Sequence, residues 1–288
     1  MTVVEAGGYA QAAQALHKSQ SSVTYAVQKL ESVLGVRAFE IRGRKAILTA
    51  TGQLLYRRAR VLVEEALELE RAAKKLSAGW EAQIRLAVEI LFPSWLLFKC
   101  FDAFGQESPH TRIELFETVL GGNAEALQQK QVDLAITPQI PTGFNGESLM
   151  RMRFVPAAHP NHPLHKLGRA LTLRDLKAHR HLVVRDSGSK RTAQTVTIDV
   201  EQRWTVSNMS TSILAAREGY GFAWYPEEKI REELAAGTLK PLPLRDGTER
   251  WAEIYLVFAD RDTAGPGTLR LADIIRDQVK QACAKQER

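Results

Sequence analysis

Apolar residues near the N-terminus recur with the period of two short helices. They predict one helix over residues 9–16 and a second over residues 20–34, with a polar turn between them. One side of the second helix is an apolar stripe that we expect to be buried, formed by Val23, Val27, Leu30 and Leu34. Ser19 is a typical N-cap residue and Gly35 a typical C-cap residue, so the sequence marks both ends of this helix.

The opposite side of the second helix is polar at its N-terminal end. With the preceding cap residue, its side chains are Ser19, Gln20, Ser21, Ser22, Thr24, Tyr25 and Gln28. In a DNA-binding helix-turn-helix, the first residues of the second helix reach base edges in the major groove, where glutamine can form two hydrogen bonds with adenine. An ordinary helical hairpin with a solvated polar side has the same pattern, so the helices alone leave both interpretations open.

A basic turn follows the second helix. Residues 36–41 and 46–49 are short β-prone runs, and the turn between them carries Arg42, Arg44 and Lys45. This pattern predicts a β-hairpin wing whose tip contacts DNA phosphates or the minor groove. A basic turn is often only solvated, but its position beside a recognition-type helix favours DNA.

The stretch from Ala12 to Gly52 has the sequence AAQALHKSQSSVTYAVQKLESVLGVRAFEIRGRKAILTATG. It closely resembles the winged helix-turn-helix of LysR-type transcriptional regulators, and it follows their pattern A-A-x-x-L-x-x-S-Q-x-x-V-[ST]-x-x-[VI]-x-x-L-E-x-x-L-G-V-x-x-F nearly throughout. Many members have proline at Ser21, and basic or amide residues at Tyr25 and Ala26. These departures concern the DNA sequence that is bound and not the fold. The resemblance continues more loosely over the whole chain.

The resemblance implies a longer first helix than this chain has, because Met1 falls inside that helix. We expect weaker DNA binding than in a form extended at the N-terminus. The favoured function is a sequence-specific DNA-binding transcriptional regulator controlled by a small-molecule effector. The alternative is a small-molecule-binding protein with a weakened DNA-binding head.

Residues 53–80 form a predicted long helix with a heptad seam. The seam residues are Leu55, Ala59, Leu62, Ala66, Leu69, Ala73 and Leu76. The seam is narrow and flanked by charged residues, which favours an intermolecular coiled coil over packing against the helix's own domain. The family uses this helix to pair subunits, so we expect a homodimer or homotetramer that presents two recognition helices to double-stranded DNA. RNA polymerase is a further partner that the resemblance implies.

From residue 83 onward, strands and helices alternate, which predicts an α/β fold with a largely parallel sheet. The expected strands cover residues 84–90, 112–117, 132–137, 182–185, 203–206, 221–225 and 253–258. The expected helices cover residues 94–104, 123–129, 208–218 and 267–284. Near residues 154–163 the pattern breaks into a crossover rich in proline and histidine.

This arrangement resembles the periplasmic-binding-protein-like effector domain of the same family, which has two lobes. The predicted organisation is a winged helix-turn-helix, mainly α, over residues 1–52, a linker and dimerisation helix over 53–80, and an effector-binding α/β domain over 83–288. The last of these divides into lobe I, at about 83–157 and 257–288, and lobe II, at about 158–256.

Ligands in open α/β sheets bind beyond the carboxyl ends of the strands. Candidate effector-binding residues in such places are Phe92, Ser94, Thr137, Pro138, Ser187, Ser207, Asn208 and Met209. Hydroxyls and helix N-termini suit a small carboxylate or a similar polar molecule. Serine and asparagine are also ordinary N-caps, so each polar position has a purely structural alternative.

The distribution of charge supports a DNA-binding N-terminus. The formal net charge is +6. Residues 1–62 contain nine basic and three acidic side chains, so the whole excess lies in this segment. A basic segment of this kind is the electrostatic signature of a protein that binds nucleic acid.

Other chemistry has little support in the sequence. Prolines interrupt His159, His162 and His165, and no cysteine or carboxylate cluster accompanies them, so we expect no metal site. Cys100 and Cys283 are too few for a disulfide scaffold. We find no nucleophile elbow and no phosphate loop, and we expect neither a catalytic residue nor a cofactor. With no signal sequence or long apolar run, the expected location is the cytoplasm, without a membrane partner.

Overall fold

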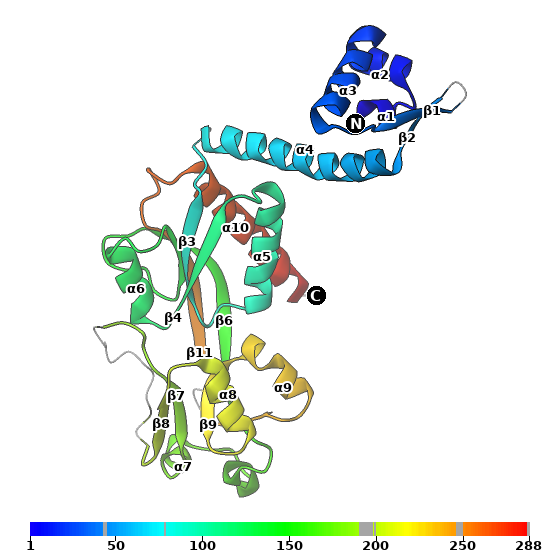
Figure 1. Ribbon diagram of the computed structural model, residues 1–288. Coiled ribbons are helices and arrows are strands. Elements are labelled where there is room, and N and C mark those ends of the chain that lie inside the picture. Colours follow the sequence, from blue (N-terminus) through cyan, green and yellow to red (C-terminus); the bar gives the residue numbers. More distant parts are fainter. Residues whose placement is uncertain (43–44, 78, 190–197, 199, 246–249, 287–288) are drawn as a thin grey trace. The chain divides into compact units, whose positions relative to one another are not determined.

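The computed structural model describes residues 1–42, 45–77, 79–189, 198, 200–245 and 250–286 (Figure 1). The chain forms two compact units, Met1–Ala78 and Gly79–Arg288. The long helix that follows the wing belongs to the first unit. Among the described residues, no helix has the length and apolar character needed to cross a membrane.

The first unit contains short helices, a two-stranded wing and a long helix. Its elements are α1 (Thr2–Glu5), α2 (Tyr9–Ala15), α3 (Gln20–Leu34), β1 (Phe39–Arg42), β2 (Lys45–Leu48) and α4 (Ala50–Ser77). The predicted helix-turn-helix, wing and long helix are therefore confirmed.

Helix α3 begins and ends as the sequence predicts. The Ser19 hydroxyl accepts a hydrogen bond from the Ser22 N–H at 3.2 Å, and Gly35 adopts the left-handed conformation with φ 65°. The predicted buried stripe is only half correct, because Val23 is buried whereas Leu30 and Leu34 are 52% and 47% exposed. The buried cluster around α1 and α2 covers only the N-terminal turns of α3.

The wing is tied to both neighbouring helices. The Glu31 carboxylate on α3 accepts hydrogen bonds from the N–H groups of Ala38 and Phe39 at 2.7 and 3.0 Å. Thr49 accepts a hydrogen bond from the Gly52 N–H at 2.9 Å, so α4 begins at Ala50, three residues earlier than predicted. A Cβ atom on Gly52 would lie 1.9 Å from the Ala38 carbonyl oxygen, so the start of α4 requires glycine there.

The second unit contains a mixed sheet with helices on both faces. Its strands are β3 (Gln83–Glu89), β4 (Arg112–Thr118), β5 (Leu134–Thr137), β6 (Gly146–Ala158), β7 (His181–Val184), β8 (Arg203–Val206), β9 (Phe222–Pro226), β10 (Lys240–Pro241) and β11 (Arg250–Phe258). Its α-helices are α5 (Ser94–Glu107), α6 (Gly121–Gln128), α7 (Leu173–Lys177), α8 (Met209–Arg217), α9 (Arg231–Ala235) and α10 (Pro266–Gln286). Its 3₁₀ helices are η1 (Pro163–Leu167) and η2 (Glu227–Lys229).

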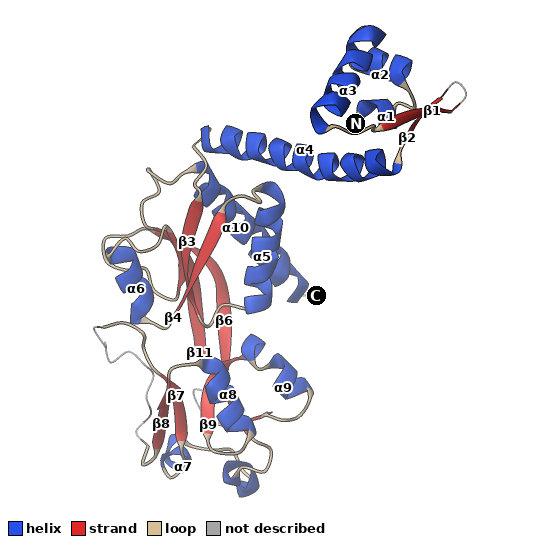
Figure 2. Ribbon diagram, in the orientation of Figure 1, coloured by secondary structure: helices blue, strands red, loops and turns tan. Residues whose placement is uncertain are grey.

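In the described chain, the sheet has the order β4-β3-β5-β11-β6-β9-β7-β8, and β10 pairs with β6. Figure 2 draws the strands in red and the helices in blue. We call β4, β3 and β5 the first half of the sheet, and β9, β7 and β8 the second half. Strands are parallel within each half, and the antiparallel pair β11 and β6 joins the halves. The predicted α/β class is confirmed. The exact lobe boundaries stay a prediction.

One predicted element is wrong. Residues 154–158 were expected to belong to an irregular crossover, but they continue β6, where Phe154 pairs with Pro226 and Ala158 with Phe222. Pro156 is accommodated within this strand, and its carbonyl oxygen accepts a hydrogen bond from the Leu242 N–H at 2.8 Å. Long-range pairing with β9 and β10 thus overrides the local signal of a proline.

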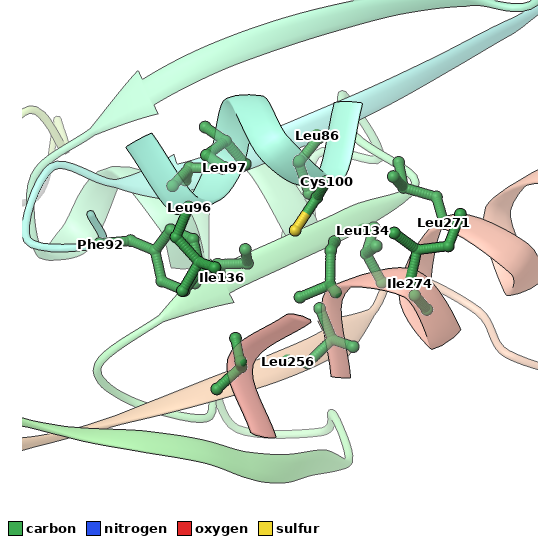
Figure 3. Packing of buried hydrophobic residues seen from close by; sticks show 14 of the residues in the cluster. Leu86, Phe92, Leu96, Leu97, Cys100, Leu134, Ile136, Leu256, Leu271 and Ile274 are labelled. Carbon is green, nitrogen blue, oxygen red and sulfur yellow. The ribbon is translucent and has the colours of Figure 1, made fainter. Parts of the chain in front are cut away.

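The largest core lies between helices α5 and α10 and the face formed by the first half of the sheet with the joining strands β11 and β6 (Figure 3). Alternating residues of β3 separate the two sheet faces. Ile84, Leu86 and Val88 face this core, whereas Ala87 packs in the α6 layer. Cys100 is buried in the core and Cys283 is partly buried, and neither forms a disulfide. In the second half, α8 packs on one face, and the segment from η1 to α7 packs on the other.

Candidate nucleic-acid interface and ligand pocket

The hydroxyl groups at the start of α3 form a local network. Ser19 Oγ lies 2.9 Å from Ser21 Oγ and 2.8 Å from Ser22 Oγ, and the Thr24 hydroxyl donates to the Gln20 carbonyl oxygen at 2.9 Å. These bonds fix the hydroxyls at the surface of the first turn. They leave the side chains of Gln20, Tyr25 and Gln28 exposed beside them.

The described part of the wing adds one basic side chain. Arg42 is exposed and pairs with Glu40 at 2.8 Å. An exposed ion pair of this kind stabilises a protein by about 1 kcal/mol or less, so a phosphate can replace the carboxylate. Arg44 lies outside the described residues. Lys45 opens β2, and its side chain is also outside the described part.

A cavity of about 420 Å³ lies within the second unit. Its size falls within the usual range for small-molecule sites. One side is formed by the segments that follow β3, β4 and β5, and the other by the second half of the sheet, α8 and the start of β11. Of the predicted effector-binding residues, Pro138 and Met209 line this cavity.

The other predicted residues in the first half of the sheet make structural contacts. Phe92 is only 2% exposed and belongs to the core beneath α5. The Ser94 hydroxyl accepts a hydrogen bond from Lys229 Nζ at 2.9 Å. Thr137 is buried, and its hydroxyl donates to the Gln139 carbonyl oxygen at 3.0 Å.

The remaining predicted residues lie at the junction of the two halves or cap a helix. The Ser187 hydroxyl accepts from the Val119 N–H at 2.8 Å, which ties the loop after β7 to the loop after β4. Asn208 caps α8 by accepting from the Ser210 N–H at 2.8 Å, and Ser207 is an exposed residue just before this cap. None of the three is among the residues that line the cavity in the described chain.

Sequence reasoning missed an aromatic and basic wall of the cavity. The described residues of β7 and β9 pair at His181 and Phe222. The residues that follow this pair in each strand, toward the carboxyl ends, line the cavity. Trp224 and Arg250 stand here, with the guanidinium carbon 4.1 Å from the centre of the indole ring. The available sequence signal was one tryptophan in each of strands β9 and β11, Trp224 and Trp251, the second directly after Arg250.

A buried carboxyl lies at the edge of the cavity. Glu89 is 1% exposed and accepts hydrogen bonds from the Leu120 N–H at 2.8 Å and from Asn123 Nδ2 at 3.0 Å. Burial raises its pKa to about 8, the Leu120 hydrogen bond opposes this shift, and the nearby Asp186 adds to it. At neutral pH, Glu89 is therefore mainly a neutral carboxylic acid.

The imidazole of His181 is also uncharged at neutral pH. Burial, together with the nearby cations Arg203 and Arg250, lowers its pKa to about 4. The ring stacks on Phe222, with centroids 5.3 Å apart, and meets Trp224 edge-on at 5.8 Å. Within the described part of the chain, no group of three potential metal ligands is placed to hold an ion.

Comparisons with known proteins match both units. The family described as bacterial regulatory helix-turn-helix protein, lysR family, matches residues 1–53, and the LysR substrate binding domain matches residues 77–280. The probable HTH-type transcriptional regulator YhaJ of Escherichia coli (strain K12) is 30% identical over 265 residues, which is 90% of this chain and 87% of that protein.

Solved structures show the same fold. ArgP from Mycobacterium tuberculosis has a TM-score of 0.58 and 20% identity, over 96% of this chain and 94% of that one. CrgA from Neisseria meningitidis has a TM-score of 0.55 and 24% identity, over 97% and 95%. The chain therefore belongs to the LysR family of transcriptional regulators, with a DNA-binding helix-turn-helix and an effector-binding domain, and it is a regulator and not an enzyme.

Proposed function

We propose that this regulator binds specific DNA sites as a homodimer or homotetramer through the first turns of α3, and that a small molecule in the pocket of the second unit controls it. The observation that carries the proposal is the exposed polar start of α3. Its exposed side chains Gln20, Tyr25 and Gln28 stand beside a hydroxyl cluster held by hydrogen bonds. Such an arrangement suits contact with base edges in the major groove.

The wing and the charge distribution support binding to the DNA backbone. Arg42, Arg44 and Lys45 provide basic groups that follow α3 in the sequence, within the segment that holds the whole positive excess. Phosphate contacts of this kind position a protein on DNA but carry little sequence information. We therefore assign specificity to α3 and general affinity to the wing. The regulator would act in the cytoplasm, where its DNA target lies.

The exposed seam of α4 supports subunit pairing. Leu62 and Leu69 are 65% and 72% exposed, and Ala66 between them is also exposed. A stripe of apolar side chains at heptad spacing is buried when two such helices pair. Pairing would let one assembly reach two half-sites on the DNA.

Control by an effector needs a difference in affinity between two arrangements of the protein. A ligand shifts such an equilibrium only if it binds one arrangement more tightly. The pocket supports this role because it lies where the two halves of the sheet meet, and it is lined by residues of both. The residues around it would change their contacts if the halves moved.

The test is DNA binding by two glutamine variants. Gln20→Ala removes a proposed base contact and should weaken binding to the cognate site by about fivefold to a hundredfold, with little effect on random DNA. Gln128→Ala, an exposed amide on α6, is the matched control and should change neither affinity. Equal losses on both DNAs for Gln20→Ala would contradict the assignment of base contacts to α3.

The salt dependence of the same binding separates the regulator from the alternative. Phosphate contacts make DNA affinity fall steeply as salt rises. A protein with a weakened head would show little DNA binding at any salt concentration, while still binding its small molecule.

A further inference from the structure

Two buried polar atoms at the cavity wall have no hydrogen-bond partner among the described residues. They are His181 Nδ1 and Trp224 Nε1. His181 is 4% exposed, and both side chains line the cavity. A buried polar group without a partner costs free energy, so an unpaired indole N–H beside a cavity indicates a ligand that accepts a hydrogen bond.

Arg250 places a positive charge at the same wall. Its guanidinium lies over the Trp224 ring, and its pKa is lowered by burial. Among the residues that the structure describes, the Arg250 side chain has no ion-pair partner. A half-buried guanidinium at a cavity wall favours an anion, because its fixed N–H groups match a carboxylate.

The two carboxyls at the cavity do not cancel this charge. Glu253 accepts a hydrogen bond from the Ser148 hydroxyl at 2.7 Å and pairs with Arg151 at 3.7 Å. Glu89 is mainly protonated at neutral pH, because burial raises its pKa to about 8. The cavity is therefore positive, and it accommodates one negative charge on a ligand.

The rest of the lining is largely apolar and partly aromatic. Leu91 and Phe154 come from the first half of the sheet and the joining strand, and Met209 and Trp251 from α8 and β11. Flat rings pack well against such side chains. A cavity of about 420 Å³ accepts a molecule with one or two rings.

We propose that the effector is a small aromatic carboxylate, whose acid group contacts Arg250 and the indole N–H of Trp224, and whose ring packs against the apolar lining. This inference rests on the proposed function of the pocket as the effector site. It names the class of ligand and the two residues that recognise its charge.

The test is titration calorimetry on the full chain with benzoate, 2-naphthoate and indole-3-acetate, each compared with its uncharged carboxamide. A charge-assisted contact predicts at least one acid that binds about tenfold or more tightly than its amide. Arg250→Gln should remove this preference. Arg180→Gln is the matched control, because Arg180 also lies over a tryptophan, Trp204 at 4.2 Å, but does not line the cavity.

Several outcomes would overturn the proposal. The proposal fails if acids and amides bind with equal affinity, or if benzylamine binds more tightly than benzoate. It also fails if folded Arg250→Gln protein keeps the preference for acids over amides. Binding of acetate as tight as that of the aryl acids would refute the aromatic part. If Arg250→Gln fails to fold, the comparison of acids with amides in the unmodified chain decides. DNA binding measured in parallel without ligand tests the proposed regulator function separately.

Discussion

The two units bury their apolar residues in different ways. In Met1–Ala78 the buried cluster is small and built from Val3, Ala12, Ala13 and Val23, while large apolar side chains on α3 and α4 remain exposed. In Gly79–Arg288, α5 and α10 cover a sheet face, and the core between them is dense (Figure 3). A small unit with a small core is marginally stable, so burial of its exposed apolar side chains on association would add to its stability.

The contrast between the units extends to their polar groups. The hydroxyls of α3 stand in solvent and are satisfied by neighbours within four residues. In the second unit, Glu89, His181 and Trp224 are placed at a cavity, and polar atoms of two of them lack partners in the described chain. Association with other macromolecules is therefore expected for the first unit, and small-molecule binding for the second.

The largest expected effect comes from the α4 seam. Leu69→Asp places a charge on the exposed apolar seam, and we expect the chain to become monomeric because a buried aspartate would be desolvated. Loss of the second DNA-binding head should weaken binding to a two-half-site DNA by about a hundredfold or more. Light scattering and anisotropy measure the two effects. Glu65→Asp, also on α4 but off the seam, is the control and should change neither the oligomeric state nor the affinity. A Leu69→Asp protein that remains dimeric would show that the seam is not the dimer interface.

The next effect concerns Glu89 and pH. Its pKa in the folded chain is about 8, against an ordinary value of 4.5. Between these two pKa values the folded chain keeps a proton on Glu89 that the unfolded chain has lost. The stabilising contribution of protonated Glu89 is therefore fully present below pH 4.5 and is lost as the pH rises toward 8. Glu89→Gln should remove this loss, which amounts to about 1.4 kcal/mol per pH unit at most.

Urea unfolding at about pH 5, 6.5 and 8 measures this difference between the unmodified and variant chains. Glu201→Gln, which changes an exposed carboxyl of the same unit, is the control and should leave the pH profile as it is. Parallel pH profiles for Glu89→Gln and the unmodified chain would show that burial does not keep this carboxyl protonated.

A smaller effect is expected at the start of α4. Gly52→Ala brings a Cβ atom to 1.9 Å from the Ala38 carbonyl oxygen, so the junction of wing and helix must shift. Overpacking of this kind costs about 1–3 kcal/mol. Calorimetric unfolding should show a lower transition temperature for the first unit, with the second unit unchanged. An unshifted transition would mean that the junction adapts without cost.

The smallest effect has the opposite sign and lies in the other unit. Gly105 is in α5, and a Cβ atom there would meet no atom within 4 Å. Gly105→Ala should therefore stabilise the second unit by about 0.5–1 kcal/mol, because alanine loses less backbone freedom in a helix. The same calorimetric scan measures this change. A lower transition temperature for the second unit would show that the space beside Gly105 does not accommodate a methyl group.

Local features could be predicted from the sequence because they depend on neighbours along the chain. The Ser19 cap, the left-handed Gly35 and the bounds of α3 are set by contacts three to five residues apart. The long helix was placed within three residues of its ends for the same reason. The exposure of Leu30 and Leu34 was missed because helical periodicity identifies an apolar side but not what covers it.

The pocket could be predicted only in part because it depends on distant pairing. Its position beyond strand ends was expected, and Pro138 and Met209 line it. Arg250 reaches the wall because β11 pairs with β6, where it lies opposite Phe154, almost a hundred residues away in the sequence. The predicted polar positions Ser94, Ser187 and Asn208 are instead engaged in hydrogen bonds that hold the fold.

Sequence-specific binding of DNA by α3 is what makes this protein a regulator of particular genes. Its most direct test is to incubate the purified full chain with fragmented genomic DNA at moderate salt, recover the bound fragments and sequence them. We expect a shared, partly palindromic motif, which the Gln20→Ala protein recovers poorly and the Gln128→Ala protein recovers fully. Dimeric, folded protein that recovers fragments without a common motif would contradict sequence-specific binding.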